Sequence, residues 1–138
     1  MNATIVALTG YISWTLFLLV VIAIYRTMLV MKKERLPNAF KADGSDSPDM
    51  GQRLTRAQLN CAESFAFTGG VMLLALATSS SAVTDPLALW LLAARVAQSV
   101  VHLVSTSVLA VQIRFAFFLA QVGISGYWLF TLFTKFVA

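Results

Sequence analysis

The sequence predicts an all-α integral membrane protein, a bundle of four helices that each cross the bilayer. Hydrophobic residues make up 59% of the 138 residues and charged residues only 12%, whereas soluble domains keep about a quarter of their residues charged. The mean hydropathy is +0.80, and the apolar residues stand in four long blocks. Because a helix needs roughly 20 residues to cross ~30 Å of hydrocarbon, we expect residues 1–138 to form a single four-span membrane domain.

The first apolar block predicts a span over about residues 3–31, with no charge before Arg26. It lacks the basic start and small-residue cleavage site of a signal peptide, so we expect it to be retained as the first span. A polar loop follows over about residues 32–49, in which Pro37 and Gly44 break the helical pattern. Ser47 followed by Pro48 is typical of a helix start, and the second span is predicted over about residues 50–78.

The two C-terminal blocks predict the remaining spans. Asp85 followed by Pro86 is a second helix-start signal after a serine-rich link, and it places the third span at about residues 86–111. The fourth span is predicted over about residues 115–138, where Lys135 is the only charged residue. We therefore expect the third and fourth spans to meet near Gln112–Arg114.

The basic residues are concentrated between the first and second apolar blocks. Basic loops lie on the cytoplasmic side, so we expect this loop in the cytoplasm and both termini on the non-cytoplasmic side. Acidic residues are interleaved with the basic ones, which favours contact with lipid headgroups and argues against a nucleic-acid partner. The basic residues in or beside this segment are Arg26, Lys32, Lys33, Arg35, Lys41, Arg53 and Arg56.

The second predicted span carries four polar residues on one face. Ionisable residues inside a span face protein or a water-filled site and mark function by default. At ~100° per residue these four side chains fall within about 80° of one another. We therefore predict a polar stripe running from the cytoplasmic end into the membrane, made of Arg53, Arg56, Asn60 and Glu63.

The third predicted span repeats this pattern with Arg95, Ser99, His102 and Thr106, spaced by four, three and four residues. Arg95 and Glu63 lie at similar depths, so a buried ion pair between them is predicted. A plainer interpretation is that these polar residues only join helices. Likewise, the arginines near the cytoplasmic end could extend toward headgroups, and His102 could be a buried, neutral imidazole.

Two residue types occur once each. Cys61 is the only cysteine, so no intrachain disulfide can form, and we expect it to pack against neighbouring helices. His102 is the only histidine, and no cluster with metal-ligand spacing occurs, so no metal site is predicted.

The run RLTRAQLNCAESF, residues 53–65, resembles the signature of the MAPEG family, the membrane-associated proteins in eicosanoid and glutathione metabolism. A second resemblance, to the third helix of bacterial members, starts at Ala94-Arg95-Val96 and continues through Ser99 and His102 to Arg114-Phe115. Chain length and four-span layout fit the family over the whole sequence.

The resemblance implies a homotrimer with glutathione, as co-substrate, bound between neighbouring subunits near the cytoplasmic side. It implies a glutathione-dependent transferase or peroxidase that acts on lipophilic electrophiles or hydroperoxides arriving from the membrane lipid. Arg114 would be the catalytic residue that stabilises the glutathione thiolate. The residues that would hold the carboxylates and amino group of glutathione are Arg53, Arg56, Asn60 and Glu63.

The sequence departs from the eicosanoid synthases at two positions and in one span. Ser64 stands where they have tyrosine and Ala66 where they have proline, and the third span has no tyrosine, so leukotriene synthesis is not expected. One alternative is a non-catalytic membrane scaffold or lipid-binding protein of the same fold. Another is a small four-span multidrug exporter, which would need a carboxylate in its first span, where this chain has none.

Overall fold

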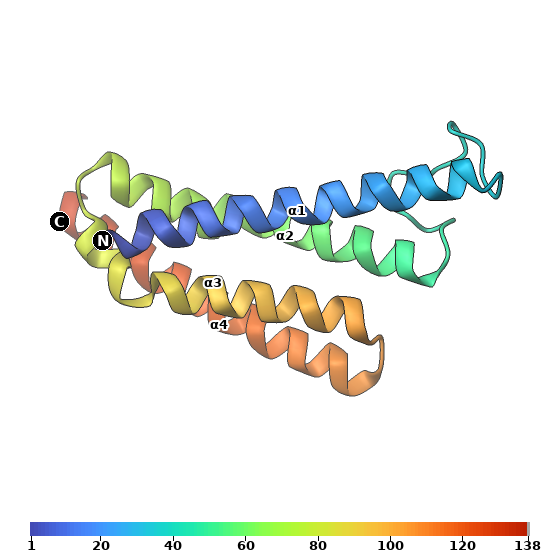
Figure 1. Ribbon diagram of the computed structural model, residues 1–138. Coiled ribbons are helices and arrows are strands. Elements are labelled where there is room, and N and C mark those ends of the chain that lie inside the picture. The colour runs from blue at the N-terminus through green and yellow to red at the C-terminus, as the bar shows by residue number, and fades with distance from the viewer. Residues whose placement is uncertain (138) are drawn as a thin grey trace.

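The structure is a computed structural model that describes residues 1–137, and it consists of four helices joined by one loop and two short turns (Figure 1). The helices are α1 (Ala3–Met31), α2 (Asp49–Ala77), α3 (Ser81–Val104) and α4 (Val108–Val137). Each is long and apolar enough to cross a membrane, and residues 1–137 contain no strand. The all-α, four-helix prediction is therefore confirmed. Ala138, the last residue of the predicted fourth span, lies outside the described residues.

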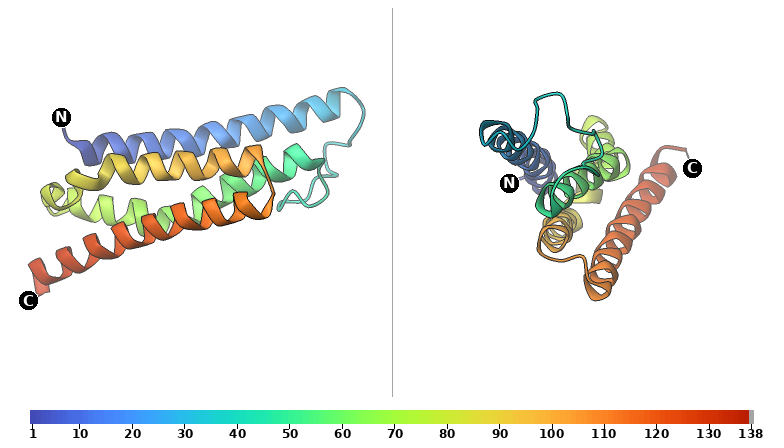
Figure 2. Two further views of the ribbon diagram at one scale, coloured as in Figure 1. Left: turned by 90° about the horizontal axis from the view of Figure 1, so that it is seen from below. Right: turned by 90° about the vertical axis from the view of Figure 1, so that its right-hand side faces the viewer.

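The four helices differ in their packing partners and in how far they extend along the bundle. Helix α1 packs against α2 and α3, whereas α4 packs mainly against α3 and less against α2. Both termini lie at one end of the bundle, and α1 and α2 extend past the α3–α4 turn at the other end (Figures 1 and 2). In the left view of Figure 2, α4 diverges from the other helices toward its C-terminus. The α3–α4 turn therefore lies beside α2, part of the way along its length.

The core is a stripe of small and apolar side chains shared by all four helices. On α1 the buried positions follow helical spacing and include Thr4, Ala7, Leu8, Tyr11 and Leu18. They pack with buried residues that include Cys61, Met72, Leu91 and Trp128. Gly10 allows α1 to approach α3, since a Cβ there would lie 2.7 Å from Cδ2 of Leu92.

The N-terminus of α1 is capped by its own Asn2 and by α3. The Asn2 side chain accepts from the backbone N–H of Ile5 at 3.0 Å. Oδ1 of Asp85 accepts from the N–H of Thr4 at 2.8 Å and from its hydroxyl at 2.6 Å. Because the first N–H groups of a helix have no intrahelical partner, Asp85 satisfies a free donor and joins the starts of α1 and α3.

The C-termini of α1 and α2 end in the same way without glycine. Lys33 and Ser79 adopt the left-handed conformation, with φ of 59° and 53°. The next residue then donates back into the last turn of the helix, from Glu34 to Leu29 at 3.0 Å and from Ser80 to Ala75 at 2.7 Å. These are Schellman motifs, which satisfy carbonyl groups left free at a helix end.

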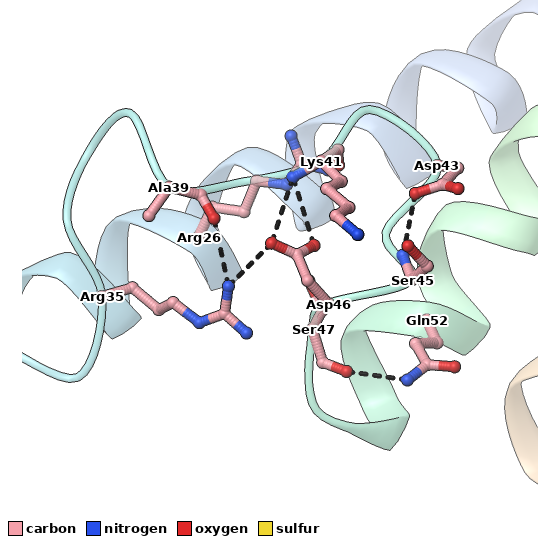
Figure 3. A network of polar contacts seen from close by, with 9 residues as sticks. All are labelled: Arg26, Arg35, Ala39, Lys41, Asp43, Ser45, Asp46, Ser47 and Gln52. Carbon is pink, nitrogen blue, oxygen red and sulfur yellow. Dashed lines mark hydrogen bonds and ion pairs between the residues drawn. The ribbon is translucent and has the colours of Figure 1, made fainter.

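The loop between α1 and α2 is organised around Asp46 (Figure 3). Its carboxylate accepts from Nη1 of Arg35 at 2.8 Å and from the backbone N–H of Lys41 at 3.1 and 3.2 Å. The Phe40 ring faces two guanidinium groups, with Cζ of Arg26 at 5.3 Å and Cζ of Arg35 at 5.8 Å from its centroid. Part of the basic charge of this loop is thus engaged within it.

The last two helices differ from the predicted third and fourth spans. Helix α3 begins at Ser81, five residues before Pro86, and α4 begins at Val108 rather than near residue 115. The chain turns at residues 105–107, where the Ser107 hydroxyl accepts from the N–H of Ala110 at 3.2 Å and acts as an N-cap. The prediction that the spans meet near Gln112–Arg114 was wrong, and Arg114 lies inside α4.

Candidate functional site

A pocket of about 560 Å³ opens between α2, α3 and α4, near the α3–α4 turn. Helices α2 and α4 each supply polar and apolar side chains to its wall, and α3 supplies two polar side chains. The lining residues are Arg56, Leu59, Asn60 and Glu63 from α2, Gln98 and His102 from α3, and Val111, Arg114, Phe115 and Phe118 from α4.

Three of the four residues of the predicted α2 stripe line this pocket. Arg56 and Glu63 are exposed and Asn60 is half-buried, and their spacing places them on one face of the helix. Arg53, one turn earlier, is not among the lining residues. Its Nη1 donates to the carbonyl of Val104, the last residue of α3, at 3.3 Å, where a cation also opposes the negative end of the helix dipole.

Arg95 does not pair with Glu63, contrary to the sequence-based prediction. Among the described residues the only ion pair joins Arg35 and Asp46. The Arg95 side chain is fully buried and its Nη1 donates to Oδ1 of Asn60. Glu63 has a depth similar to that of Arg95, but it lies about 60° further around α2 than Asn60, which turns it toward the pocket and away from the core.

The surroundings of Arg95 are polar but contain no carboxylate within ion-pair distance in residues 1–137. Its guanidinium carbon lies 5.5 Å from the centroid of the Tyr11 ring, a cation–π contact. Tyr11 in turn donates its hydroxyl to the carbonyl of Cys61 at 2.8 Å. Nε and Nη2 of Arg95 are buried and have no hydrogen-bond partner among the described residues.

The contact with Arg95 determines how Asn60 faces the pocket. A guanidinium only donates hydrogen bonds, so the Asn60 oxygen must be the atom turned toward Arg95. The Asn60 amide nitrogen is then free to donate into the pocket that Asn60 lines. Arg95 thus reaches the site through Asn60.

The wall between α3 and α4 is held by two side-chain contacts. Nε2 of Gln121 donates to Oε1 of Gln98 at 2.9 Å, and both glutamines are buried. Nearer the turn, Nη1 of Arg114 lies 2.7 Å from Nδ1 of His102. Arg114, predicted as the catalytic residue, therefore lines the pocket with a defined neighbour.

Ser99, Thr106 and Cys61 lie away from this pocket. The Cys61 sulfur is 3.2 Å from the Ser99 hydroxyl, and both residues are buried, so Cys61 packs as predicted. Thr106 lies in the α3–α4 turn. Gln98 and His102 are the α3 residues that line the pocket, and Ser99 lies about 100° further around the helix than Gln98.

Aromatic and aliphatic side chains form the other part of the wall. Phe115 stacks on Phe118 with 6.4 Å between ring centroids, and Phe67 meets Phe118 edge to face, also at 6.4 Å. Phe115 is 58% exposed, so the apolar side of the pocket continues onto the surface of α4. The site can therefore accept a polar, charged group on one side and an apolar molecule on the other.

The charges of the lining favour an anionic ligand that also carries a cation. Arg56 and Arg114 supply two guanidinium groups, and Glu63 supplies one carboxylate. Guanidinium groups bind carboxylates in bidentate geometry, and a carboxylate binds an ammonium. In residues 1–137 no group of three or more His, Cys, Asp or Glu side chains could hold a metal ion.

Sequence reasoning missed several lining residues. Gln98 was not considered, although it follows Arg95 by three residues and precedes His102 by four, a spacing that could have identified it. Leu59, Val111 and Phe118 carry no polar signal and could not be distinguished from lipid-facing residues. Their role follows only from the position of α4.

Comparison with known proteins identifies a family. The sequence model of the MAPEG family matches residues 4–134, which is nearly the whole chain. No curated protein and no solved structure matches.

Proposed function

The chain belongs to the MAPEG family, and we propose that it is a membrane enzyme that binds glutathione in the α2–α3–α4 pocket. The family match and the four apolar helices make it an integral, multi-pass membrane protein. We propose that it transfers glutathione to lipophilic electrophiles or uses glutathione to reduce lipophilic hydroperoxides. The observation that carries this proposal is that Arg56, Asn60, Glu63 and Arg114 line one pocket.

The charged groups of glutathione match those of the pocket. The tripeptide carries two carboxylates and one ammonium, and the pocket offers two guanidinium groups, the amide N–H₂ of Asn60 and the carboxylate of Glu63. Arg56 and Asn60 would bind a carboxylate, and Glu63 would bind the ammonium. Arg53 does not line the pocket, and one of its donors binds the Val104 carbonyl; its remaining N–H groups would still be able to bind a glutathione carboxylate.

Arg114 would activate the glutathione thiol for reaction. A cation beside a thiol lowers the pKa of the thiol and raises the concentration of the thiolate nucleophile. In conjugation, the thiolate sulfur forms a bond to the electrophilic carbon as the leaving group departs with its electron pair. In hydroperoxide reduction, the thiolate sulfur forms a bond to the terminal peroxide oxygen as the O–O bond breaks, and the departing alkoxide takes a proton and leaves as the alcohol. The thiol of a second glutathione then attacks the resulting sulfenic acid, which gives the disulfide and water.

We further propose a homotrimer with glutathione between neighbouring subunits. Arg56 and Glu63 are exposed on α2 in the single chain, and charged side chains in contact with lipid are costly. A neighbouring subunit over this face would cover them and close the open side of the pocket. Native mass spectrometry of the protein released from detergent tests this, with a three-subunit mass expected.

The orientation in the membrane is also a proposal. The loop of residues 32–48 carries Lys32, Lys33, Arg35 and Lys41, and the positive-inside rule places it in the cytoplasm, with both termini on the other side. Cys61 is the only cysteine and is buried, so a Ser45→Cys variant would carry a single reactive thiol in this loop and would report on which side of the membrane the loop lies. An impermeant thiol reagent should reach it only from the cytoplasmic side.

A non-catalytic lipid-binding protein of the same fold is the second candidate. The observation that favours it is the apolar wall of Phe115 and Phe118, which continues onto the outer surface of α4. In that case the pocket would hold a lipid chain without activating a thiol. Glutathione would then not bind, and lipid would copurify with the protein.

Thiolate formation separates the two candidates. Ultraviolet difference spectroscopy of the purified protein with glutathione should show thiolate absorbance, and the protein should conjugate an aromatic electrophile to glutathione. Both signals should be lost in Arg114→Met and kept in Lys32→Met, which removes an exposed positive charge outside the pocket. Equal signals in these two variants would contradict the proposed role of Arg114.

A further inference from the structure

The contact between Arg114 and His102 fixes the chemical form of the imidazole. Nη1 of Arg114 lies 2.7 Å from Nδ1 of His102. A guanidinium has only donors, so Nδ1 must accept and cannot carry a proton. The imidazole is then neutral, with its proton on Nε2. A protonated imidazole would place a donor against a donor and two positive charges side by side.

The same contact restricts the Arg114 side chain. Arginine has a long, flexible side chain, and in residues 1–137 no carboxylate lies within 4.0 Å of it. Nε of Arg114 is buried without a hydrogen-bond partner among the described residues. His102, in the last turn of α3, therefore supplies the side-chain acceptor that the structure shows for this guanidinium.

A fixed cation stabilises a developing anion better than a mobile one, because no reorganisation is needed when the charge forms. We propose that His102, as the neutral Nε2-protonated tautomer, is a positioning residue that holds the Arg114 guanidinium toward the glutathione thiolate. This inference rests on the proposed function. It excludes His102 as the base that takes the thiol proton, since its unprotonated nitrogen is occupied by Arg114.

The histidine itself provides a test that needs no glutathione. Because His102 is the only histidine, ¹⁵N-histidine labelling gives one imidazole signal pair in the nuclear magnetic resonance spectrum. We expect an unprotonated, hydrogen-bonded Nδ1 and a protonated Nε2 at neutral pH. In Arg114→Met the Nδ1 signal should shift to that of an imidazole without this donor. A protonated Nδ1 in the wild-type protein would overturn the proposal.

Substitutions at His102 test the consequence for the thiol. Asparagine places its side-chain oxygen close to the position of Nδ1 and can accept from Arg114, whereas leucine cannot. We expect His102→Leu to raise the pKa of the bound glutathione thiol by about one unit, a tenfold loss of thiolate below that pKa. His102→Asn should restore the thiolate to within about threefold of wild type. A Thr106→Val control in the turn should match wild type.

The outcomes distinguish this inference from the proposed function. If the wild-type protein forms thiolate and His102→Leu forms it equally well, the positioning role is overturned and the function stands. If His102→Asn is as impaired as His102→Leu, acceptance at Nδ1 is not what matters, and the proposal is likewise overturned. If the wild-type protein forms no thiolate, the proposed function fails, and the positioning role fails with it.

Discussion

The buried guanidinium of Arg95 donates to the side-chain oxygen of Asn60, and not to a carboxylate. Arg95 is fully buried, and a buried charge is costly unless polar groups surround it. Asn60 and the Tyr11 ring provide those groups. The same hydrogen bond turns the Asn60 amide N–H₂ toward the pocket, so one contact links the stability of the bundle to its ligand chemistry.

Substitutions at Asn60 test this link. Asn60→Ala removes the acceptor of a buried charged donor and should lower the free energy of unfolding by about 1.5–3 kcal/mol. Asn60→Asp gives Arg95 a counter-ion and should keep or raise the stability, yet it removes the amide donor and should abolish glutathione binding. Unfolding in mixed detergent micelles measures the first effect. If Asn60→Ala unfolded like wild type, Arg95 would not depend on Asn60.

Glu63 should matter for the ligand and not for the fold. It is exposed and lines the pocket, so Glu63→Gln should change the free energy of unfolding by less than about 0.5 kcal/mol. The affinity of the Glu63→Gln variant for glutathione should fall about tenfold, because the ammonium of glutathione loses the negatively charged acceptor of its hydrogen bond. Had Glu63 paired with Arg95, its removal would cost about 3–5 kcal/mol. A stability loss of that size would show that Glu63 pairs with Arg95, and would contradict the contact between Arg95 and Asn60.

The start of α1 depends on Asp85. Its carboxylate accepts both the N–H and the hydroxyl of Thr4, so Asp85→Ala should lower the free energy of unfolding by about 1–2 kcal/mol. Asp85→Asn keeps an acceptor oxygen and should lose less. Since Asp85 lies at the opposite end of α3 from His102, glutathione affinity of the folded variant should stay unchanged. A selective loss of affinity would indicate that the two ends are coupled.

The loop of residues 32–48 should loosen in acid. Burial by itself would raise the pKa of Asp46, but hydrogen bonds from the Lys41 N–H and from Arg35 outweigh it and hold that pKa below its usual value. A carboxyl with a lowered pKa in the folded state stabilises that state at higher pH and loses this effect as the pH falls through the folded-state pKa. The loop should therefore be ordered at neutral pH, begin to loosen as the pH falls below the usual carboxyl pKa of about 3.9, and become mobile only once the pH is below the lowered folded-state pKa of Asp46.

Asp46→Asn reproduces this effect at neutral pH, because it removes the charge that Arg35 and Lys41 contact. Amide hydrogen exchange in the loop should then rise severalfold, while exchange in the helix cores stays as in wild type. Asp43→Asn is the matched control. The Ser45 N–H bond holds the pKa of Asp43 low as well, but this carboxylate contacts only its own turn. Equal exchange in the two variants would show that Asp46 does not organise the loop.

The sequence was sufficient to predict the four helices and most of the polar site. Apolar blocks of spanning length and the helical spacing of Arg56, Asn60 and Glu63 are local signals. The boundary between α3 and α4 was missed because residues 105–107 interrupt an apolar stretch without proline or glycine. Only the cap formed by Ser107 marks the helix start there.

Partner choice within the site could not be read from helical spacing. Depth along the helices matched Arg95 with Glu63, but direction around α2 selected Asn60. Similarly, the contact between His102 and Arg114 depends on the turn at residues 105–107, which brings α4 back beside the end of α3. Such contacts follow from the packing of helices and not from the pattern within any one of them.

Calorimetric titration of glutathione into the purified protein tests the central claim most directly, with Arg56→Met and Lys32→Met as a matched pair. Both variants remove one exposed positive charge, but only Arg56 lines the pocket. We expect saturable binding to the wild-type protein and to Lys32→Met, and at least about tenfold weaker binding to Arg56→Met, since a charge-assisted hydrogen bond is lost. Absence of saturable binding to the wild-type protein, or equal binding by both variants, would contradict the assignment of this pocket to glutathione.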